Sequence, residues 1–237
     1  MDAAIYKALS GAIVQMRRLE IAAQDLGNIN TAGYKGQRLS FSEVLANAAP
    51  ASERPGGWVA ISGAKTNTSG GEIYNTGNPF NLAIGGDGYF VVQTPRGERY
   101  TRNGSLTLRS DGTLVTTAGD PVLSESGPLQ TSGNKFTVSP DGMVSGDQGE
   151  IGKLRIVHFI NNQQVLREGG SLFQTLRPNV QDATDYQIVQ GGLEQSNVSP
   201  IDSMVLMITN QRHFDAYERA IRMMDGTTEK MIAEAGR

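Results

Sequence analysis

The sequence predicts an α+β protein: an all-β central domain of antiparallel strands and hairpins, flanked by long N- and C-terminal α-helices that pair as a coiled coil. Two heptad patterns, one near each end of the chain, predict the helices. The middle of the chain is rich in Gly, Thr, Ser and Asn, and its short apolar runs lie between turn signals, which predicts strands. The predicted regions are an N-terminal helix (1–35), a connecting extension (36–71), a β-rich body (72–190), and a linker with the C-terminal helix (191–237).

The N-terminal helix is predicted over residues 3–29, where apolar residues recur at alternating spacings of 4 and 3. No proline interrupts this heptad seam, and the single internal glycine, Gly11, costs about 1 kcal/mol relative to alanine. We expect the helix to end near Gly27 to Asn30. The predicted seam consists of Ile5, Leu9, Ala12, Met16, Leu19, Ala23 and Leu26.

Short apolar runs in the β-rich body are the strand candidates: 82–84, 89–93, 105–108, 113–116, 135–138, 153–159 and 186–190. Turn signals separate them at 85–88, Asn103-Gly104, Asp111-Gly112 and Asp141-Gly142. Asn-Gly and Asp-Gly pairs adopt positive φ at low cost, so each can reverse the chain in a tight loop. These signals predict antiparallel hairpins.

The C-terminal helix is predicted to begin after Pro200. Ser199 fits an N-cap followed by proline at the first helical position, and Asp202 adds negative charge to the first turn, where the helix dipole favours it. Asn210 falls on the seam, where a buried amide penalises wrong registers, or else it lies exposed at the margin of the helix. The seam includes Met207, Asn210, Phe214, Tyr217, Ile221 and Met224.

The two terminal helices carry the functional hypothesis. A lone amphipathic helix is marginal in water, so we expect each seam to pack on the other, with the remaining apolar faces covered by other copies of the chain. Val205 and Ile208 lie off the seam, which gives the C-terminal helix more apolar surface than one partner can cover. The alternative is that both helices only pack onto their own domain.

Composition argues against several other functions. A net charge of −3 and a pI near 5.5 predict no nucleic-acid partner, and zero cysteines exclude disulfides and thiolate metal sites. The two histidines, His158 and His213, lie far apart in the sequence, and no catalytic, metal or cofactor motif is present, so the chain is predicted not to be an enzyme. No cleavable signal or bilayer-spanning run is visible, which predicts no direct membrane insertion.

Four separated stretches resemble the rod and hook family of bacterial flagellar axial proteins. The first, Asn28-Ile29-Asn30-Thr31-Ala32-Gly33-Tyr34-Lys35, follows the N-terminal helix; Asn30 and Thr31 can turn the chain and Gly33 permits a sharp exit. The others are 82–92, 100–112 and 190–198, the last of which is similar to the linker before the family's C-terminal helix. By its length the chain is most similar to a proximal rod subunit.

The resemblance implies a structural, self-assembling subunit of the flagellar basal-body rod, which crosses the periplasm and transmits motor torque to the hook. Its partners would be other copies of itself, neighbouring rod, hook and basal-body subunits, and the flagellar type III export apparatus, which exports without signal cleavage. The assembly interface would comprise the two seams together with Asn28, Asn30, Thr31, Gly33 and Tyr34. The alternatives are a distal rod subunit or a secreted β-rich binding module.

Overall fold

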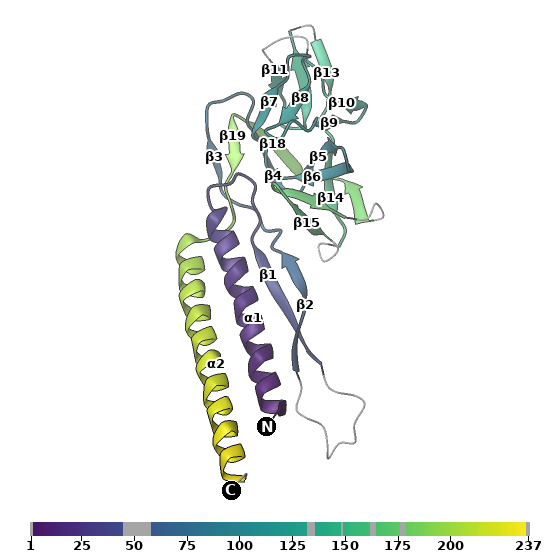
Figure 1. The fold of residues 1–237 in the computed structure, drawn as a ribbon. Coiled ribbons are helices and arrows are strands. Elements are labelled where there is room, and N and C mark those ends of the chain that lie inside the picture. Colours follow the sequence, from purple (N-terminus) through teal and green to yellow (C-terminus); the bar gives the residue numbers. More distant parts are fainter. Residues whose placement is uncertain are drawn as a thin grey trace. The chain divides into compact units, whose positions relative to one another are not determined.

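The computed structural model describes residues 2–44, 58–131, 136–147, 149–161, 165–175 and 179–235. The chain forms two compact units, and successive segments of the sequence belong alternately to one and the other (Figure 1). The helical unit contains residues 1–27, 37–65 and 199–237, and the β-rich unit contains residues 28–36 and 66–198. Neither helix in the described ranges has a stretch both long enough and apolar enough to cross a bilayer. The predicted all-β body with a helix at each end of the chain is confirmed.

The helical unit consists of α1 (Asp2–Gly27), α2 (Pro200–Ala235) and a two-stranded sheet of β1 (Gln37–Val44) and β2 (Trp58–Thr66). The two helices lie side by side and run in opposite directions (Figure 1). Helix α1 ends at Gly27, as predicted, and α2 begins at Pro200 with the predicted cap, because the backbone N–H of Asp202 donates to Ser199 Oγ at 3.3 Å. The strands β1 and β2 fall in the range expected to be a connecting extension.

The β-rich unit is built from antiparallel strands. Its largest sheet has six strands in the order β15-β16-β6-β5-β14-β17, beside a three-stranded sheet β11-β12-β13 and the pairs β18-β4, β19-β3, β7-β8 and β10-β9. The strand bounds are β3 (Ile73–Asn75), β4 (Leu82–Gly86), β5 (Tyr89–Thr94), β6 (Gly97–Thr101), β7 (Leu106–Leu108), β8 (Leu114–Thr116), β9 (Leu123–Ser124), β10 (Gly127–Pro128), β11 (Phe136–Val138), β12 (Met143–Gly146), β13 (Gly149–Lys153), β14 (Ile156–Phe159), β15 (Leu166–Gly169), β16 (Leu172–Gln174), β17 (Val180–Asp182), β18 (Tyr186–Gln190) and β19 (Gly192–Glu194).

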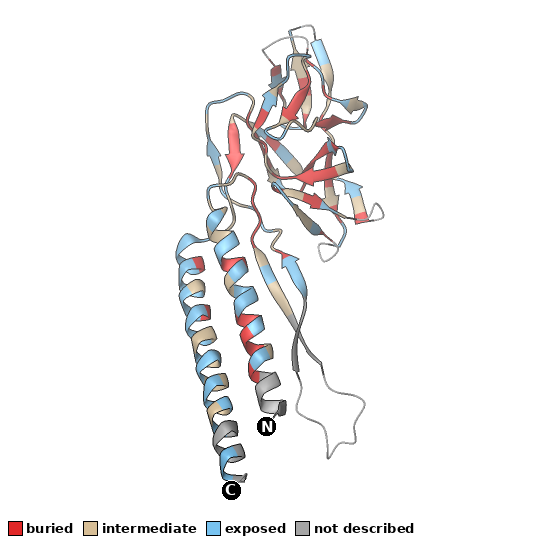
Figure 2. Ribbon diagram, viewed as in Figure 1, coloured by how far each residue is buried: buried red, intermediate tan, exposed pale blue. Residues whose placement is uncertain are grey.

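Strand β5 separates two apolar clusters and is buried on both faces. Phe90 and Val92 belong to one cluster, whereas Tyr89 and Val91 belong to the other. Successive side chains of a strand point to opposite faces, so a continuous apolar run places β5 at the centre of the core. Figure 2 shows buried residues concentrated in these central strands, while most of α2 is exposed. The β-rich unit therefore has a core of its own.

Two of the predicted hairpin turns are confirmed and two are wrong. Asp111-Gly112 joins the paired strands β7 and β8, and Asp141-Gly142 joins the paired strands β11 and β12. In contrast, Asn103-Gly104 and the turn at 85–88 connect strands that lie in different sheets. The first of these is constrained by packing, because a methyl group at Gly104 would lie 1.6 Å from the carbonyl oxygen of Leu82. A turn signal predicts a reversal of the chain but does not specify which strands pair.

One predicted strand is interrupted. The range 153–159 is divided into the end of β13 at Lys153 and the start of β14 at Ile156, and these strands belong to different sheets. The remaining strand candidates coincide with described strands to within one residue at their starts, although Lys135 itself lies outside the described residues. Strands without a clear apolar run, such as β3, β15 and β17, were not predicted, because cross-strand pairing and not local pattern defines them.

Candidate functional site: the helix faces and a buried clasp

The predicted seam of α2 lies on the less exposed side of this helix. Asn210 is buried, with 6% of its surface exposed, and the other five seam residues are half-buried. Asn210 therefore lies off the exposed margin that was the alternative for it. The half-buried seam residues are Met207, Phe214, Tyr217, Ile221 and Met224.

The face of α1 that is buried differs from the predicted seam. Ala12 is buried and Leu19 and Leu26 are half-buried, but Leu9 and Met16 are each 45% exposed and Ala23 is exposed. The buried stripe is shifted by one residue at three places, and the side chain of Ile5 lies outside the described residues. Leu9 and Met16 are thus more exposed in this chain than a seam packed on α2 predicts. The stripe observed consists of Ala8, Ala12, Gln15, Leu19, Ala22 and Leu26.

Gly11 lies at a contact between the two helices. A methyl group at Gly11 would lie 2.6 Å from the ring of Tyr217, so the two helices approach closely at this point. Ala8 and Ala12, on either side of Gly11, are buried, whereas the longer side chain of Leu9 is 45% exposed. Heptad spacing does not distinguish adjacent stripes of α1, and next to Gly11 the close approach of the helices favours burial of Ala8 over Leu9.

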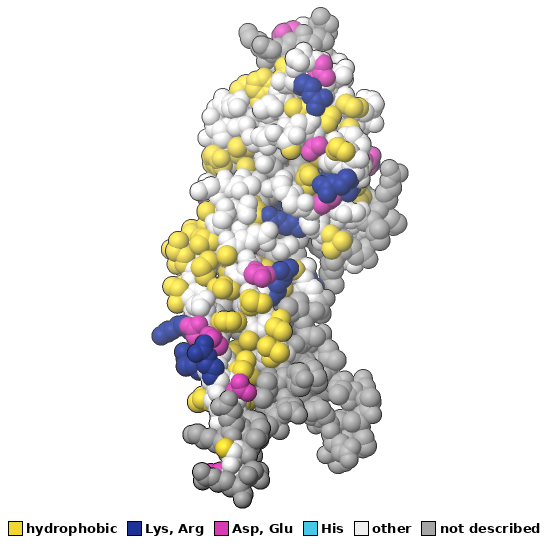
Figure 3. Space-filling model, in the orientation of Figure 1, with side chains coloured by type: hydrophobic (Ala, Val, Ile, Leu, Met, Phe, Trp, Pro, Cys, Tyr) yellow, Lys and Arg dark blue, Asp and Glu magenta, His cyan; other side chains and the backbone are white. Residues whose placement is uncertain are grey.

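The larger apolar residues are left on exposed stripes. On α1 the stripe consists of Leu9, Ile13 and Met16, which are 45–47% exposed. On α2 the side chains of Ile201, Met204, Val205 and Ile208 are 51–72% exposed, and they recur at the spacing of one helical face. Hydrophobic side chains gather over both helices on the face shown in Figure 3. Each helix thus has an apolar stripe that nothing in the described part of the chain covers.

A groove of about 400 Å³ lies within the helical unit, between α1, α2 and β1. Ile21, Leu39 and Leu206 contribute apolar surface to it, while Arg18 and Asn210 contribute polar groups. Asn210 is thus placed at the point where all three elements meet.

The stretch that follows α1 folds into the β-rich unit. The backbone N–H of Thr31 donates to the carbonyl oxygen of Asn28 at 3.1 Å, and the N–H of Tyr34 donates to that of Thr31 at 3.2 Å, so two successive turns follow the helix. Gly33 has a φ of +65°, and a methyl group there would lie 2.3 Å from the backbone carbon of Arg102. Only glycine fits both requirements. Tyr34 is buried, Asn28 and Thr31 are half-buried, and Asn30 is exposed.

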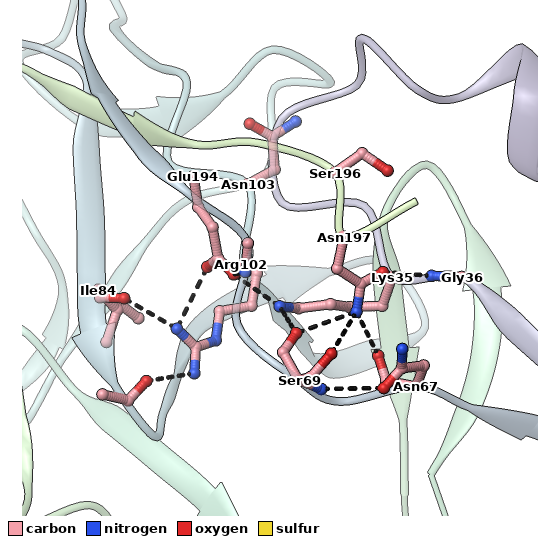
Figure 4. A network of polar contacts seen from close by, with 12 residues as sticks. Lys35, Gly36, Asn67, Ser69, Ile84, Arg102, Asn103, Glu194, Ser196 and Asn197 are labelled. Carbon is pink, nitrogen blue, oxygen red and sulfur yellow. Dashed lines mark hydrogen bonds and ion pairs between the residues drawn. The ribbon is translucent and has the colours of Figure 1, made fainter. Parts of the chain in front are cut away.

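Three buried side chains and one half-buried side chain form a polar network, here called the clasp (Figure 4). Lys35, Arg102 and Glu194 are buried, and the half-buried Asn197 donates to the same carbonyl oxygen of Ser69 as Lys35. Lys35 Nζ donates to Glu194 Oε1 at 2.6 Å, and Arg102 NH1 lies 3.2 Å from Glu194 Oε2. The side chains of Lys35, Arg102 and Glu194 are at most 2% exposed. Removal of one partner from such a pair leaves an uncompensated buried charge, at a cost of about 3–5 kcal/mol.

Backbone groups make further hydrogen bonds to these charged side chains. The N–H of Gly71 donates to Glu194 Oε1 at 2.7 Å, and Lys35 Nζ also donates to the carbonyl oxygen of Ser69 at 2.6 Å. Arg102 donates from NH1 to the carbonyl oxygen of Ile84 at 2.9 Å and from NH2 to that of Gly86 at 2.7 Å. Burial lowers the pKa of Lys35, and the neighbouring Glu194 carboxylate opposes that shift.

The clasp is suited to holding segments together and not to catalysis. Both carboxylate oxygens of Glu194 accept hydrogen bonds, and Lys35 is enclosed by its acceptors, so neither group is presented to a substrate. Among the residues described, no group of three or more His, Asp or Glu side chains is arranged to hold a metal ion.

The clasp residues were not predicted as a site. Each of them lies in a stretch that carries the family resemblance, and the stretches contribute two cations, one carboxylate and one amide. The opposite charges of these residues, in separate motifs, were the sequence feature that could have suggested an ion pair between them. Because Lys35 and Glu194 are 159 residues apart in the chain, their contact depends on the tertiary fold.

Comparisons of the sequence with known proteins identify relatives of this chain. Residues 83–146 match the family model described as the flagellar hook protein FlgE/F/G D1 domain, and residues 189–234 match the flagellar basal body rod FlgEFG protein C-terminal model. The chain is 37% identical to the flagellar basal-body rod protein FlgF of Caulobacter vibrioides, over 97% of this chain and 95% of that protein. Identity to FlgF of Salmonella typhimurium is 32% (95% of each chain), and to the flagellar basal-body rod protein FlgG of Bacillus subtilis 28% (96% and 97%). The chain belongs to the flagellar basal-body rod protein family.

Proposed function

We propose that this chain is a proximal rod subunit of the flagellar basal body, which polymerises through its helical unit and transmits motor torque towards the hook. Family membership favours a structural role over the alternative of a secreted β-rich binding module. The relatives named FlgF favour the proximal rod, and the relative named FlgG keeps the distal rod as the alternative. Counting and locating the subunit in isolated basal bodies distinguishes the two.

The observation that supports assembly is the pair of uncovered apolar stripes. Soluble monomers seldom expose contiguous apolar surface of this kind without an interaction partner. The stripes lie on the helices near the two ends of the chain, and their exposed side chains are available to other subunits. We propose that Leu9 and Met16 serve between subunits, and that stacked helices form a coiled-coil tube around which the β-rich unit is placed.

Some of the remaining predicted interface residues pack within this chain, and others are proposed to contact neighbouring subunits. Ala12, Leu19 and Leu26 lie on the α1 stripe buried within this chain, and Asn28, Thr31, Gly33 and Tyr34 stabilise the turns beside the clasp. We propose that Asn30, which is exposed, and Ala23 contact neighbouring rod or hook subunits. Export through the flagellar type III apparatus is consistent with zero cysteines, since no disulfide has to form after export.

Ile208→Asp tests the assembly role. Ile208 is 61% exposed, so a carboxylate there is solvated in the monomer but would be buried without a partner in an assembled stripe. We expect normal monomer folding by circular dichroism, together with loss of incorporation into basal bodies and loss of swarming. The matched control is His213→Asp, at an exposed position of the same helix outside the stripe. Normal incorporation of Ile208→Asp would contradict the proposal.

A further inference from the structure

The clasp lies where the chain passes between its two units. The unit boundaries fall after residues 27, 36, 65 and 198, so four crossings connect the helical unit to the β-rich unit. Segments 28–36, 66–72 and 194–198 are therefore the parts of the β-rich unit next to these crossings. Every covalent path from the helices into the β-rich unit passes through one of the three.

Asn197 bonds to two of these segments from the third. Its Oδ1 accepts a hydrogen bond from the backbone N–H of Gly36 at 2.9 Å. Its Nδ2 donates to the carbonyl oxygens of Asn67 at 2.9 Å and Ser69 at 3.0 Å. One amide side chain thus joins the crossings after residues 36, 65 and 198, using both its donor and its acceptor.

Glu194 joins the same segments and connects them to the core. Its backbone carbonyl oxygen accepts from Gly33 N–H at 2.8 Å, on the segment that follows α1, and its carboxylate accepts from Lys35 and Gly71. The carboxylate also pairs with Arg102, whose guanidinium donates to two carbonyl oxygens of β4. A continuous set of hydrogen bonds and ion pairs therefore leads from the crossings to a buried strand.

We propose that Asn197 and Glu194 are positioning residues that hold the four crossings together and pass mechanical load from the helices into the β core. The mechanical role of the clasp rests on the proposed function, because only a rod subunit carries torque. The local part of the inference is a property of the monomer: without these side chains, the crossing segments open while the sheets remain closed. Buried ion pairs and hydrogen bonds resist separation of the segments that they join.

The experiment compares Asn197→Asp with the parent chain by amide hydrogen exchange. Aspartate keeps the shape and the acceptor for Gly36 N–H, but it replaces the donor to Asn67 and Ser69 by a carboxylate that repels their carbonyl oxygens. We expect exchange of the Asn67 and Gly71 amides to rise roughly tenfold or more. The Gly36 amide should change less, and the Val91 amide in β5 should not change.

Two further variants sharpen the result. Glu194→Gln is nearly isosteric but is uncharged and has one acceptor oxygen in place of two, so both ion pairs are lost and Lys35 or Arg102 loses its hydrogen bond to residue 194. The Gly33 and Gly71 amides should therefore exchange faster. The control is Asn78→Asp, an exposed position where the side-chain oxygen still accepts from Phe80 N–H, and it should leave all these amides within about twofold of the parent.

The outcomes separate the two proposals. Unchanged exchange at Asn67 and Gly71 in Asn197→Asp, an equal rise at Val91, or global loss of the fold would each overturn the local role of the clasp. Incorporation into basal bodies is scored independently: a parent chain that never enters the rod contradicts the proposed function and leaves the exchange result standing. A clasp variant that opens locally yet supports normal swarming under viscous load would overturn the mechanical part.

Discussion

The two units of this chain differ in how completely they bury their apolar side chains. In the β-rich unit, strand β5 is covered on both faces, and Phe90 and Val91 have no exposed surface. In the helical unit, comparable side chains such as Ile208 and Met204 are more than half exposed. The difference shows that the β-rich unit buries its apolar core within itself, whereas the helical unit leaves apolar stripes that the described part of the chain does not cover.

Phe90→Ala should have the largest effect on stability. It removes a ring with no exposed surface from the centre of the core and should lower the free energy of unfolding of the β-rich unit by about 3–5 kcal/mol. Ile208→Ala in the helical unit should change it by less than about 0.5 kcal/mol in the monomer. Urea denaturation followed by circular dichroism measures both. Equal losses would mean that the α2 stripe is already covered in the monomer.

Gly33→Ala tests whether the stretch after α1 is held by the β-rich unit. The substitution adds left-handed strain and a clash with the Arg102 backbone, for an expected cost of about 2–5 kcal/mol. Gly77→Ala is the matched control, because Gly77 has a φ of +70° but no atom within 4 Å of the added methyl group, and its cost should be about 1–2 kcal/mol. Similar thermal stabilities of the two variants would refute the packing role of Gly33.

Gly11→Leu examines the contact between the helices. The new side chain would displace the Tyr217 ring, so the helical unit should be destabilised by about 1–3 kcal/mol. At Gly226, which has no atom within 4 Å of an added methyl group, leucine should instead stabilise α2 by roughly 0.5–1 kcal/mol. Thermal melting followed by the far-ultraviolet helix signal distinguishes the two. A destabilising effect at both positions would show that the Tyr217 contact is not the cause.

Acid stability provides the smallest effect and concerns only the β-rich unit. A hydrogen bond from Arg99 and the nearby positive charge of Arg96 hold the pKa of Glu168 below its usual value. A lowered carboxylate pKa contributes stability above the unfolded-state pKa of about 4.3, and this contribution is lost as the pH falls through the folded-state pKa. Glu168→Gln should therefore be slightly less stable than the parent at pH 7 and equal to it in strong acid.

The control for this measurement is Glu125→Gln, at an exposed position. Melting temperatures taken along a pH series should show a difference between Glu168→Gln and the parent that shrinks on acidification. A difference that stayed constant with pH would mean that the substitution acts through packing and not through titration.

Much of the fold followed from local patterns. The ends of both helices were predictable because capping and proline signals act over a few residues, as at Ser199 and Pro200. Strands with strong apolar runs, such as β5 and β18, were also predictable. The pairing of strands across turns at Asn103-Gly104 was not, because a turn signal constrains only the residues within it.

The candidate site was predictable only in part. Heptad spacing located the helix faces, but it could not choose between adjacent stripes of α1, since the choice depends on how closely the Tyr217 ring approaches Gly11. The clasp residues were visible only as members of separate motifs. Their opposite charges are compatible with an ion pair, but the sequence around Glu194 does not specify which cation its carboxylate contacts.

The position and type of both helices, the β character of the centre and the family could be derived from the residues alone, because they depend on periodicity, capping and short motifs. The buried face of α1 and the network of clasp residues became apparent only in the folded chain. The two kinds of interaction act over different separations along the chain. Local preferences act between near neighbours in the chain, whereas steric fit and the burial of opposite charges act between residues that only folding brings together.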